Sequence, residues 1–120
     1  MAILRKLVFF ILVSFLSTSC IQEYQDLSKG EEYLKQGKYK ESISLFSKYD
    51  SKRARELNSL AYKNYAVVIL SDLNQDKIIR YKKAKPLLRK ALDLNPNNQS
   101  AKAFYKILSQ SLVSEFNEAD

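Results

Sequence analysis

The 120-residue chain contains no histidine and no tryptophan, one cysteine, two glycines and two prolines. The lack of histidine excludes a Ser-His-Asp or Cys-His hydrolase and any metal site built from imidazole ligands. A single cysteine excludes an intramolecular disulfide, so packing alone must stabilise the fold. Because so few glycines and prolines interrupt a sequence rich in Leu, Lys, Glu, Ala and Ser, we predict helices joined by short turns.

Motifs of enzymatic sites are also missing. Neither a G-x-G-x-x-G pattern nor a P-loop occurs. The adjacent carboxylates of Glu31 and Glu32 point about 100° apart on a helix, which favours a solvated face over acid–base chemistry. The sequence therefore predicts a protein that is not an enzyme and needs no cofactor and no metal.

The first 20 residues have the order of a secretory signal. A basic pair at positions 5–6 precedes an apolar run of about ten residues, too short for the roughly 20 of a membrane-spanning helix. The residues LSTS at 16–19 then lead to Cys20, and this resembles a bacterial lipobox. The resemblance implies cleavage before Cys20 and acylation of its thiol and new amine. Ser17 stands where the usual pattern has leucine, and an ordinary signal that leaves Cys20 unmodified is the alternative.

The predicted domain organisation follows from that cleavage. Residues 1–19 would be the lipoprotein signal peptide, 20–23 the acylated cysteine and a short linker, 24–116 a helical domain and 117–120 a frayed tail. Two of the 20 basic residues belong to the leader, so the mature chain would have a net charge of +5. That surplus favours acidic protein partners or anionic headgroups, and nucleic acid is not expected of an exported chain.

An internal repeat at an offset of 42 residues dominates the predicted domain. Four residues recur identically and two more pairs match in kind, namely Tyr39/Tyr81, Lys40/Lys82, Leu45/Leu87, Lys48/Lys90, Ser42/Ala84 and Phe46/Leu88. In each copy the spacing places the apolar residues on one helical face. Two copies in register indicate repeat units that bury their faces against neighbours.

The repeat resembles a tetratricopeptide (TPR) repeat. The stretch KQGKYKESI at 35–43 is similar to the family's K-Q-G-x-Y-x-E-A-I, in which Gly37 would end the first helix in a left-handed turn. The stretch ALDLNPNN at 91–98 is similar to the ending A-L-x-L-x-P-x-N, where Pro96 would stop the helix and Asn98 would cap the next.

The second copy departs from the family pattern. The offset exceeds the standard 34 residues by about eight, which we expect within Ser71–Arg80. Ile79 stands in place of the turn glycine, and Pro86 falls near the first turn of a helix that starts at Tyr81. We predict an all-α, TPR-like solenoid of about two and a half repeats. Its five helices would span Tyr24–Gln36, Lys38–Tyr49, Lys52–Ser71, Tyr81–Leu94 and Gln99–Phe116. The last would carry an apolar stripe at Ala101, Phe104, Ile107, Leu108 and Leu112.

The residues after the lipobox-like stretch carry a further pattern, formed by YQDLS at 24–28, Leu34, Gly37, Tyr39, Ser42-Ile43 and Tyr49-Asp50. Together with an acylated cysteine, this pattern resembles the first repeat of the BamD family, the lipoprotein subunits of the outer-membrane β-barrel assembly complex. It implies an accessory factor on the periplasmic face of the outer membrane. The implied partners are the periplasmic domains of a BamA-type barrel or unfolded outer-membrane protein clients. This chain has room for about half of the family's usual five repeats, so docking through the later repeats is not implied.

Two other functions remain open from the sequence. One is a generic TPR lipoprotein that acts as scaffold or pilotin for a secretion or pilus system, and the other is a structural surface lipoprotein without a client groove. TPR arrays line a concave groove with the first helix of each pair, and the candidate groove residues here are Tyr24, Leu27, Glu31, Leu34 and Lys35. A candidate basic patch comprises Lys77, Arg80, Lys82, Lys83, Lys85, Arg89 and Lys90. Core packing and a solvated face are the alternatives for these two sets.

Overall fold

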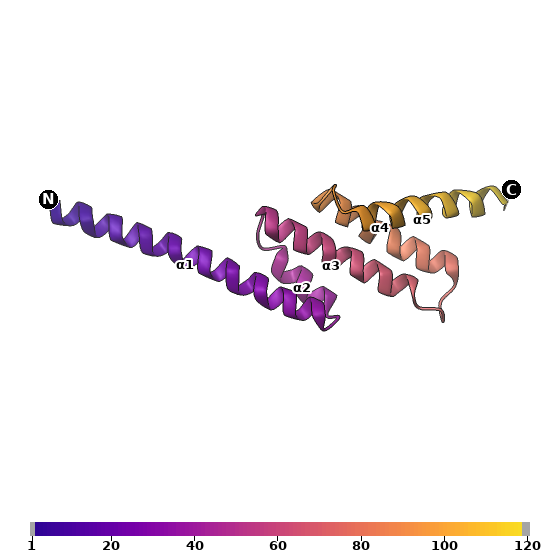
Figure 1. Cartoon of the computed structure of the whole chain (residues 1–120), viewed down its shortest axis with the longest axis horizontal. Coiled ribbons are helices and arrows are strands. Elements are labelled where there is room, and N and C mark those ends of the chain that lie inside the picture. The colour runs from indigo at the N-terminus through magenta and orange to yellow at the C-terminus, as the bar shows by residue number, and fades with distance from the viewer. Residues whose placement is uncertain (1, 119–120) are drawn as a thin grey trace.

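A computed structural model describes residues 2–118, without the side chains of residues 12–18 and 115–118. Within these residues the chain forms helices and no strand, which confirms the all-α prediction (Figure 1). The helices are α1 (Ala2–Lys35), α2 (Tyr39–Phe46), α3 (Lys52–Leu70), α4 (Lys77–Leu94) and α5 (Gln99–Glu118).

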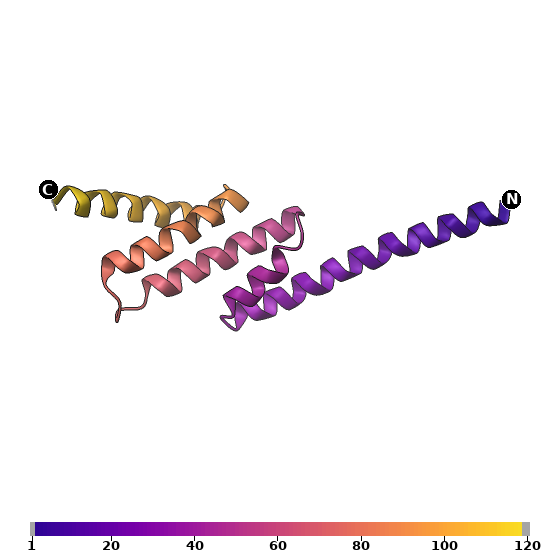
Figure 2. The same ribbon diagram turned by 180° about the vertical axis from the view of Figure 1, so that it is seen from behind.

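Consecutive helices run in alternating directions and pack side by side, α1 on α2, α2 on α3, α3 on α4 and α4 on α5. The helices thus form two hairpins, α1–α2 and α3–α4, with α5 laid on the second. The molecule measures 80 × 25 × 19 Å because the amino-terminal part of α1 projects beyond the hairpins (Figures 1 and 2).

α1 differs from its predicted bounds. It begins at Ala2 instead of Tyr24 and continues through the expected linker at 20–23. No glycine or proline stands between Ala2 and Lys29, so nothing in this stretch interrupts the helical hydrogen bonds. None of the helices that the structure describes is long and apolar enough to span a membrane.

The turn between α1 and α2 has the predicted left-handed glycine. Gly37 has φ +75°, its N–H donates to the Leu34 carbonyl at 3.1 Å, and the next N–H, that of Lys38, donates to the Tyr33 carbonyl at 2.8 Å. These two bonds form a Schellman motif, which satisfies carbonyls at the end of α1. α2 ends at Phe46, earlier than predicted, because the Lys48 and Tyr49 amides bond three residues back and tighten the chain.

The structure of the α3–α4 turn differs from the prediction in where α4 begins and in where Pro86 lies. α4 begins at Lys77, four residues before the expected Tyr81, since the Asp76 carboxylate accepts from the Ile78 amide at 2.9 Å and caps the helix. Ile79 consequently lies inside α4 and is not a turn residue. Pro86 is the tenth residue of α4, not part of its first turn, and gives no N–H to the Lys82 carbonyl. Such a proline costs about 3 kcal/mol in a helix interior.

The two hairpins bury equivalent positions of the repeat. Ser42 and Ala84 are fully buried, and so are Phe46 and Leu88. Phe46 packs in one cluster with Leu27, Ala54 and Ala61. Leu88 packs in another with Ala66, Ala84, Ala91, Ala101 and Leu108. The 42-residue offset therefore matches positions that serve the same role in packing.

α1 and α2 approach closely at Gly30. A Cβ atom built on this glycine would lie 2.4 Å from Cε1 of Phe46, a distance that real contacts do not reach. Gly30 is therefore required by the position of the Phe46 ring, and the hairpin depends on both residues.

α5 covers α4 with part of its predicted stripe. Asn98 caps α5 as predicted, accepting from the Ala101 amide at 3.1 Å, and Ala101 and Leu108 are buried. Ile107 is 54% exposed, so its assignment to the buried stripe was wrong. The helix includes residues 117 and 118 of the predicted tail, and residues 119–120 lie outside the described part of the chain.

Candidate functional site

Cys20 lies on α1, before the first side chain that the structure describes as buried. Its thiol is exposed and free. Toward the amino terminus, several large apolar side chains are exposed, namely Ile3, Leu4, Leu7, Val8, Phe9, Phe10 and Ile11. The residues LSTS before Cys20 have no described side chains apart from Ser19, which is exposed. Among the side chains that the structure describes, the core therefore begins after Cys20, at Asp26 and Leu27.

The five candidate groove residues do not share one exposed face. Leu27 is 7% exposed, and Leu34 packs against the same cluster. Glu31 accepts a hydrogen bond of 2.6 Å from the Arg53 guanidinium of α3. Tyr24 is 74% exposed and Lys35 is exposed. The geometry thus assigns Leu27 and Leu34 to packing, and leaves Tyr24 and Lys35, three turns apart, as the accessible members.

A buried carboxylate ties α1 to the α2–α3 turn. The Tyr49 hydroxyl donates to Oδ2 of Asp26 at 2.5 Å, the Gln22 amide donates to Oδ1 at 3.1 Å, and the Lys48 ammonium lies 3.8 Å from Oδ2. The bond from Tyr49 lowers the pKa of Asp26 from its usual 3.8, and the bond from Gln22 and the charge of Lys48 act in the same direction, although burial opposes them. The same carboxylate raises the pKa of Tyr49 from 10.0 to about 12. At neutral pH this network therefore favours an ionised Asp26 carboxylate and a neutral Tyr49 hydroxyl.

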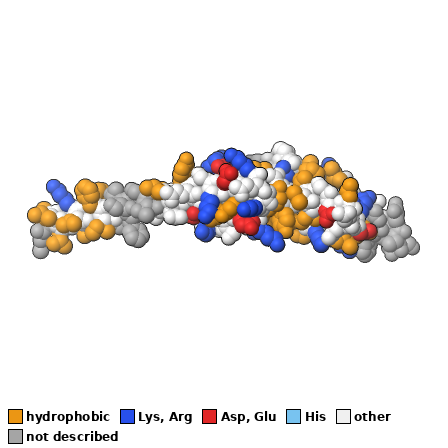
Figure 3. Space-filling view, turned by 90° about the horizontal axis from the view of Figure 1, so that it is seen from below, with side chains coloured by type: hydrophobic (Ala, Val, Ile, Leu, Met, Phe, Trp, Pro, Cys, Tyr) orange, Lys and Arg blue, Asp and Glu red, His pale blue; other side chains and the backbone are white. Residues whose placement is uncertain are grey.

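Charges of both signs gather around this end of the first hairpin. Four ion pairs lie there, Lys48–Asp26, Lys52–Glu56, Arg53–Glu31 and Arg55–Asp50. Figure 3 shows basic and acidic side chains intermixed over the middle of the molecule and hydrophobic side chains on the projecting part of α1. Pairing leaves this region with little net field.

Part of the candidate basic patch serves the fold of the second hairpin. Arg80 donates from Nη1 to the Leu70 carbonyl at 2.5 Å and from Nε to the Gln75 carbonyl at 3.2 Å, which closes the α3–α4 turn. The Lys83 ammonium donates to Oε1 of Gln75 at 3.1 Å. Two more ammonium groups lie over tyrosine rings at 5.6 Å from the ring centroid, Lys77 over Tyr81 and Lys85 over Tyr105.

The remaining three members of the patch form its accessible part. Lys82, Arg89 and Lys90 are exposed, and none of them makes a hydrogen bond or ion pair with another described residue. Lys82 and Arg89 are seven residues apart and so lie on one face of α4. This face can offer positive charge to a partner, in contrast with the paired charges of the first hairpin.

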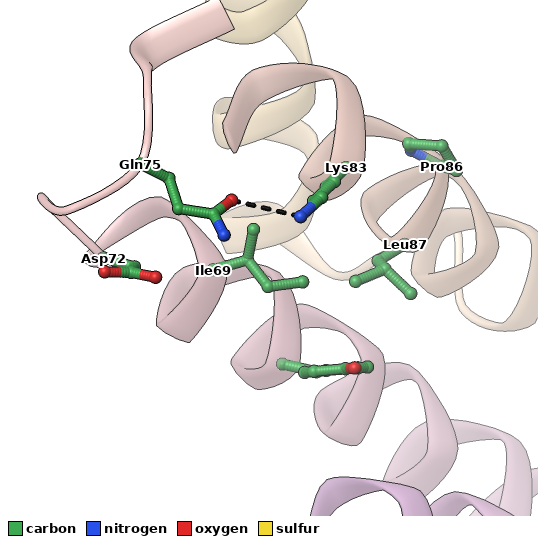
Figure 4. Close-up of a pocket in the computed structure, with 7 residues that line it drawn as sticks. Ile69, Asp72, Gln75, Lys83, Pro86 and Leu87 are labelled. Atoms are coloured by element: carbon green, nitrogen blue, oxygen red, sulfur yellow. Dashed lines mark hydrogen bonds between the residues drawn. The ribbon is translucent and has the colours of Figure 1, made fainter. Parts of the chain in front are cut away.

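A cleft of about 470 Å³ lies between α3 and α4 (Figure 4). Its wall is apolar, formed by Ile69, Pro86 and Leu87 together with the ring of Tyr65. Its polar lining comprises Asp72, Gln75 and Lys83. Tyr65 also stacks on Tyr39 of α2, with centroids 5.8 Å apart. Such a cleft suits an apolar side chain of a peptide whose backbone meets the polar groups.

A smaller hollow of about 380 Å³ lies between α1 and α2, lined by Lys29, Tyr33, Lys40, Glu41, Ser44 and Leu45. The ammonium groups of Lys29 and Lys38 lie 5.8 and 5.7 Å from the Tyr33 ring centroid. These cations are thus already placed against an aromatic face of the protein itself.

Several of these features carry no local sequence signal. Asp26 and Tyr49 are 23 residues apart, and the cleft joins α3 to α4 across a turn whose bounds were predicted wrongly. In the described part of the chain, no three His, Cys, Asp or Glu side chains gather as a metal site would require. No protein-family model, curated protein or solved structure matches the chain significantly.

Proposed function

We propose that this chain is a lipid-anchored, non-enzymatic interaction module of the bacterial envelope, built from TPR-like hairpins. Its specific task would be that of a BamD-like accessory factor in the assembly of outer-membrane β-barrel proteins. Its location would be the periplasmic face of the outer membrane, and its partners the periplasmic domains of a BamA-type barrel or unfolded clients.

The burial of equivalent positions in two successive hairpins is the observation that carries the repeat part of this proposal. The small residues Ser42 and Ala84 are fully buried at equivalent positions, and Phe46 and Leu88 belong to the two core clusters. Stacked units of this kind expose extended surfaces, which repeat proteins use to bind other proteins. The assignment to BamD-like work in particular rests on the sequence resemblance.

The anchor part is supported by where the core begins. The apolar side chains described before Cys20 stay exposed, whereas the hairpins are closed by residues from Asp26 onward. Removal of residues 1–19 would thus leave every described core residue in place. An acylated Cys20 would then hold the module at a membrane, since several acyl chains together exceed what stable anchoring needs.

The second hairpin offers the most suitable partner surface. Pro86 lines the apolar cleft, and the exposed Lys82 and Lys90 lie four residues before and after it on α4, with Arg89 three residues after it. At these spacings their side chains are neighbours of Pro86 on the helix surface. An acidic segment with an apolar side chain would satisfy both features, because the apolar group would fill the cleft and the carboxylates would meet cations that bond to no other described residue.

A matched pair of photo-crosslinking variants tests this function. A photo-reactive residue in place of Lys82 would lie beside the cleft, and the same residue at Lys40, its exposed counterpart in the first hairpin, serves as control. We expect crosslinks in intact cells from position 82 and few from position 40, and mass spectrometry should identify a barrel with periplasmic repeat domains. A secretin or pilus subunit would instead support the scaffold or pilotin function, and equal, unspecific crosslinks from both positions would contradict a dedicated partner surface.

A further inference from the structure

The helix that carries Cys20 leads without a break into the core. α1 is helical from before Cys20 to Lys35, so no flexible linker separates the proposed anchor from the first buried residues. Acylation of the Cys20 amine would stabilise the start of this helix in the mature chain. The acyl carbonyl adds a hydrogen-bond acceptor for the helix, and acylation removes the positive charge of the amine from the helix amino terminus. The first hairpin would therefore be held at a fixed orientation to the bilayer.

The apolar exposed surface next to Cys20 is one helical turn long. Ile21 is 55% exposed and Tyr24 is 74% exposed, three residues apart on one side of α1. Tyrosine suits the membrane interface because its ring is apolar and its hydroxyl reaches water. The exposed residues that follow are polar, namely Gln25, Ser28, Lys29 and Glu32. A helix that lay flat in the interface would need an apolar face along more of its length.

The α3–α4 turn lies far from Cys20. Helical rise gives about 16 Å from Cys20 to Glu31 along α1. Arg53 pairs with Glu31, and α3 then continues in the same direction for about another 26 Å to Leu70 (Figure 1). Leu73, in the turn that follows, is 83% exposed. The turn is thus about 40 Å from the anchor position by this measure.

We propose that the first turn of the mature chain, Cys20–Tyr24, is seated in the headgroup interface of the anchoring bilayer, with Ile21 and Tyr24 against lipid. The hairpins stand away from the membrane, and the α3–α4 turn and its cleft face the aqueous side. This inference rests on the proposed acylation of Cys20 and adds the orientation of the module. It places the accessible cations Lys82 and Arg89 toward soluble domains of a partner and not toward lipid headgroups.

The absence of tryptophan makes a direct test possible, because each substitution below creates a single tryptophan, whose indole can be excited selectively at wavelengths that tyrosine does not absorb. The full chain with Tyr24→Trp, and separately with Leu73→Trp, would be purified from bacterial membranes. Each variant would be placed in vesicles of phosphatidylethanolamine and phosphatidylglycerol, with and without brominated acyl chains. Both replaced side chains are exposed, so folding should be unchanged, which circular dichroism checks. Mass spectrometry of the Cys20 peptide shows whether acyl groups are present.

In acylated protein we expect the indole at position 24 to emit at shorter wavelength and to be quenched by brominated lipid, and the indole at position 73 to do neither. A water-exposed reporter at position 24 would overturn the seated turn while leaving the anchor intact. Strong lipid quenching at position 73 would show that the hairpins lie on the membrane and would overturn the orientation. Unmodified Cys20 would refute the proposed anchor itself, and this inference with it.

Discussion

The Asn98 side-chain amide donates to the Ser59 hydroxyl at 2.9 Å, and that hydroxyl donates to the Ala91 carbonyl at 2.7 Å. Through its other atom, Oδ1, Asn98 also accepts from the Ala101 amide. One asparagine thus joins the middle of α3, the end of α4 and the start of α5. Ser59 is fully buried, so this junction fixes where α5 begins on the second hairpin.

Asn98→Ala should lower the free energy of unfolding by about 2 kcal/mol, because it removes a helix cap and the bond to a buried hydroxyl. Urea unfolding followed by circular dichroism measures this. Asn98→Asp retains an acceptor for the helix cap and should lower the free energy of unfolding by less than Asn98→Ala does. The neighbouring Asn97→Ala is the control, with an expected change within about 0.5 kcal/mol. Equal losses for Asn98→Ala and Asn97→Ala would contradict the junction.

Gly30→Ala should destabilise the first hairpin by about 1–3 kcal/mol, because the new Cβ would collide with the Phe46 ring. Phe46→Leu copies the residue at the equivalent position of the second hairpin and makes room for that methyl group. The double variant should therefore be more stable than the sum of the two single losses predicts.

Thermal or urea unfolding of the two single variants and the double variant measures this coupling. Gly37→Ala is a useful contrast, since a Cβ atom built on Gly37 has no neighbour within 4 Å and only the positive φ opposes the substitution. Phe46→Leu should not rescue Gly37→Ala. Strict additivity of Gly30→Ala and Phe46→Leu would show that the two residues do not touch.

The Asp26–Tyr49 bond should give stability a dependence on pH at both ends of the scale. The pKa of Asp26 is lowered in the folded state, so its contribution is present above the usual 3.8 and is lost as the pH falls through the lowered pKa. The pKa of Tyr49 is raised to about 12, so its contribution is present below 10 and is lost as the pH rises from 10 toward 12.

Tyr49→Phe should abolish the loss of stability between pH 10 and 12, because no hydroxyl is left to ionise. The loss of stability at acidic pH should begin at a higher pH, because Asp26 without its strongest partner has a less lowered pKa. Denaturant unfolding across the pH range, compared with Tyr62→Phe as a control on a tyrosine with no carboxylate bond among the described residues, measures both effects. An unchanged alkaline slope in Tyr49→Phe would contradict the bond.

The features that the sequence predicted correctly depend on local patterns. Period-3.6 apolar spacing located the helices, and Gly37 and Asn98 marked a helix end and a helix start by their own backbone chemistry. Matched copies identified Phe46 and Leu88 as core residues before any contact was known. Whether the hairpins belong to the TPR family stays a prediction.

The features that the sequence did not predict depend on competition between neighbours. Asp76 caps α4 four residues earlier than expected, so residues 77–80 belong to the helix. Pro86 consequently lies in the helix interior and not in the first turn. Leu27 fits a groove or a core equally well by pattern, and only the positions of α2 and α3 decide that it is buried. Long-range pairs such as Asp26 and Tyr49 have no spacing rule at all.

Reversing the accessible cations Lys82, Arg89 and Lys90 to Glu should leave helix content intact, because none of them bonds within the described chain. Association with the crosslinked partner should weaken at low salt, and its dependence on salt should flatten. The matched control reverses three exposed lysines outside the basic patch, Lys40, Lys102 and Lys106, which make no hydrogen bond or ion pair with another described residue. Equal binding by both variants would show that the basic patch is a solvated face and not a partner surface.

The proposed function depends on a lipid on Cys20 that anchors these hairpins to an envelope membrane. Metabolic labelling with a radioactive fatty acid, applied to the wild type and to Cys20→Ala, tests for this lipid. Label should appear on the wild-type protein in the membrane fraction and should be absent from Cys20→Ala, which should be released or mislocalised. A wild-type protein that folds and is exported without label would contradict this proposal.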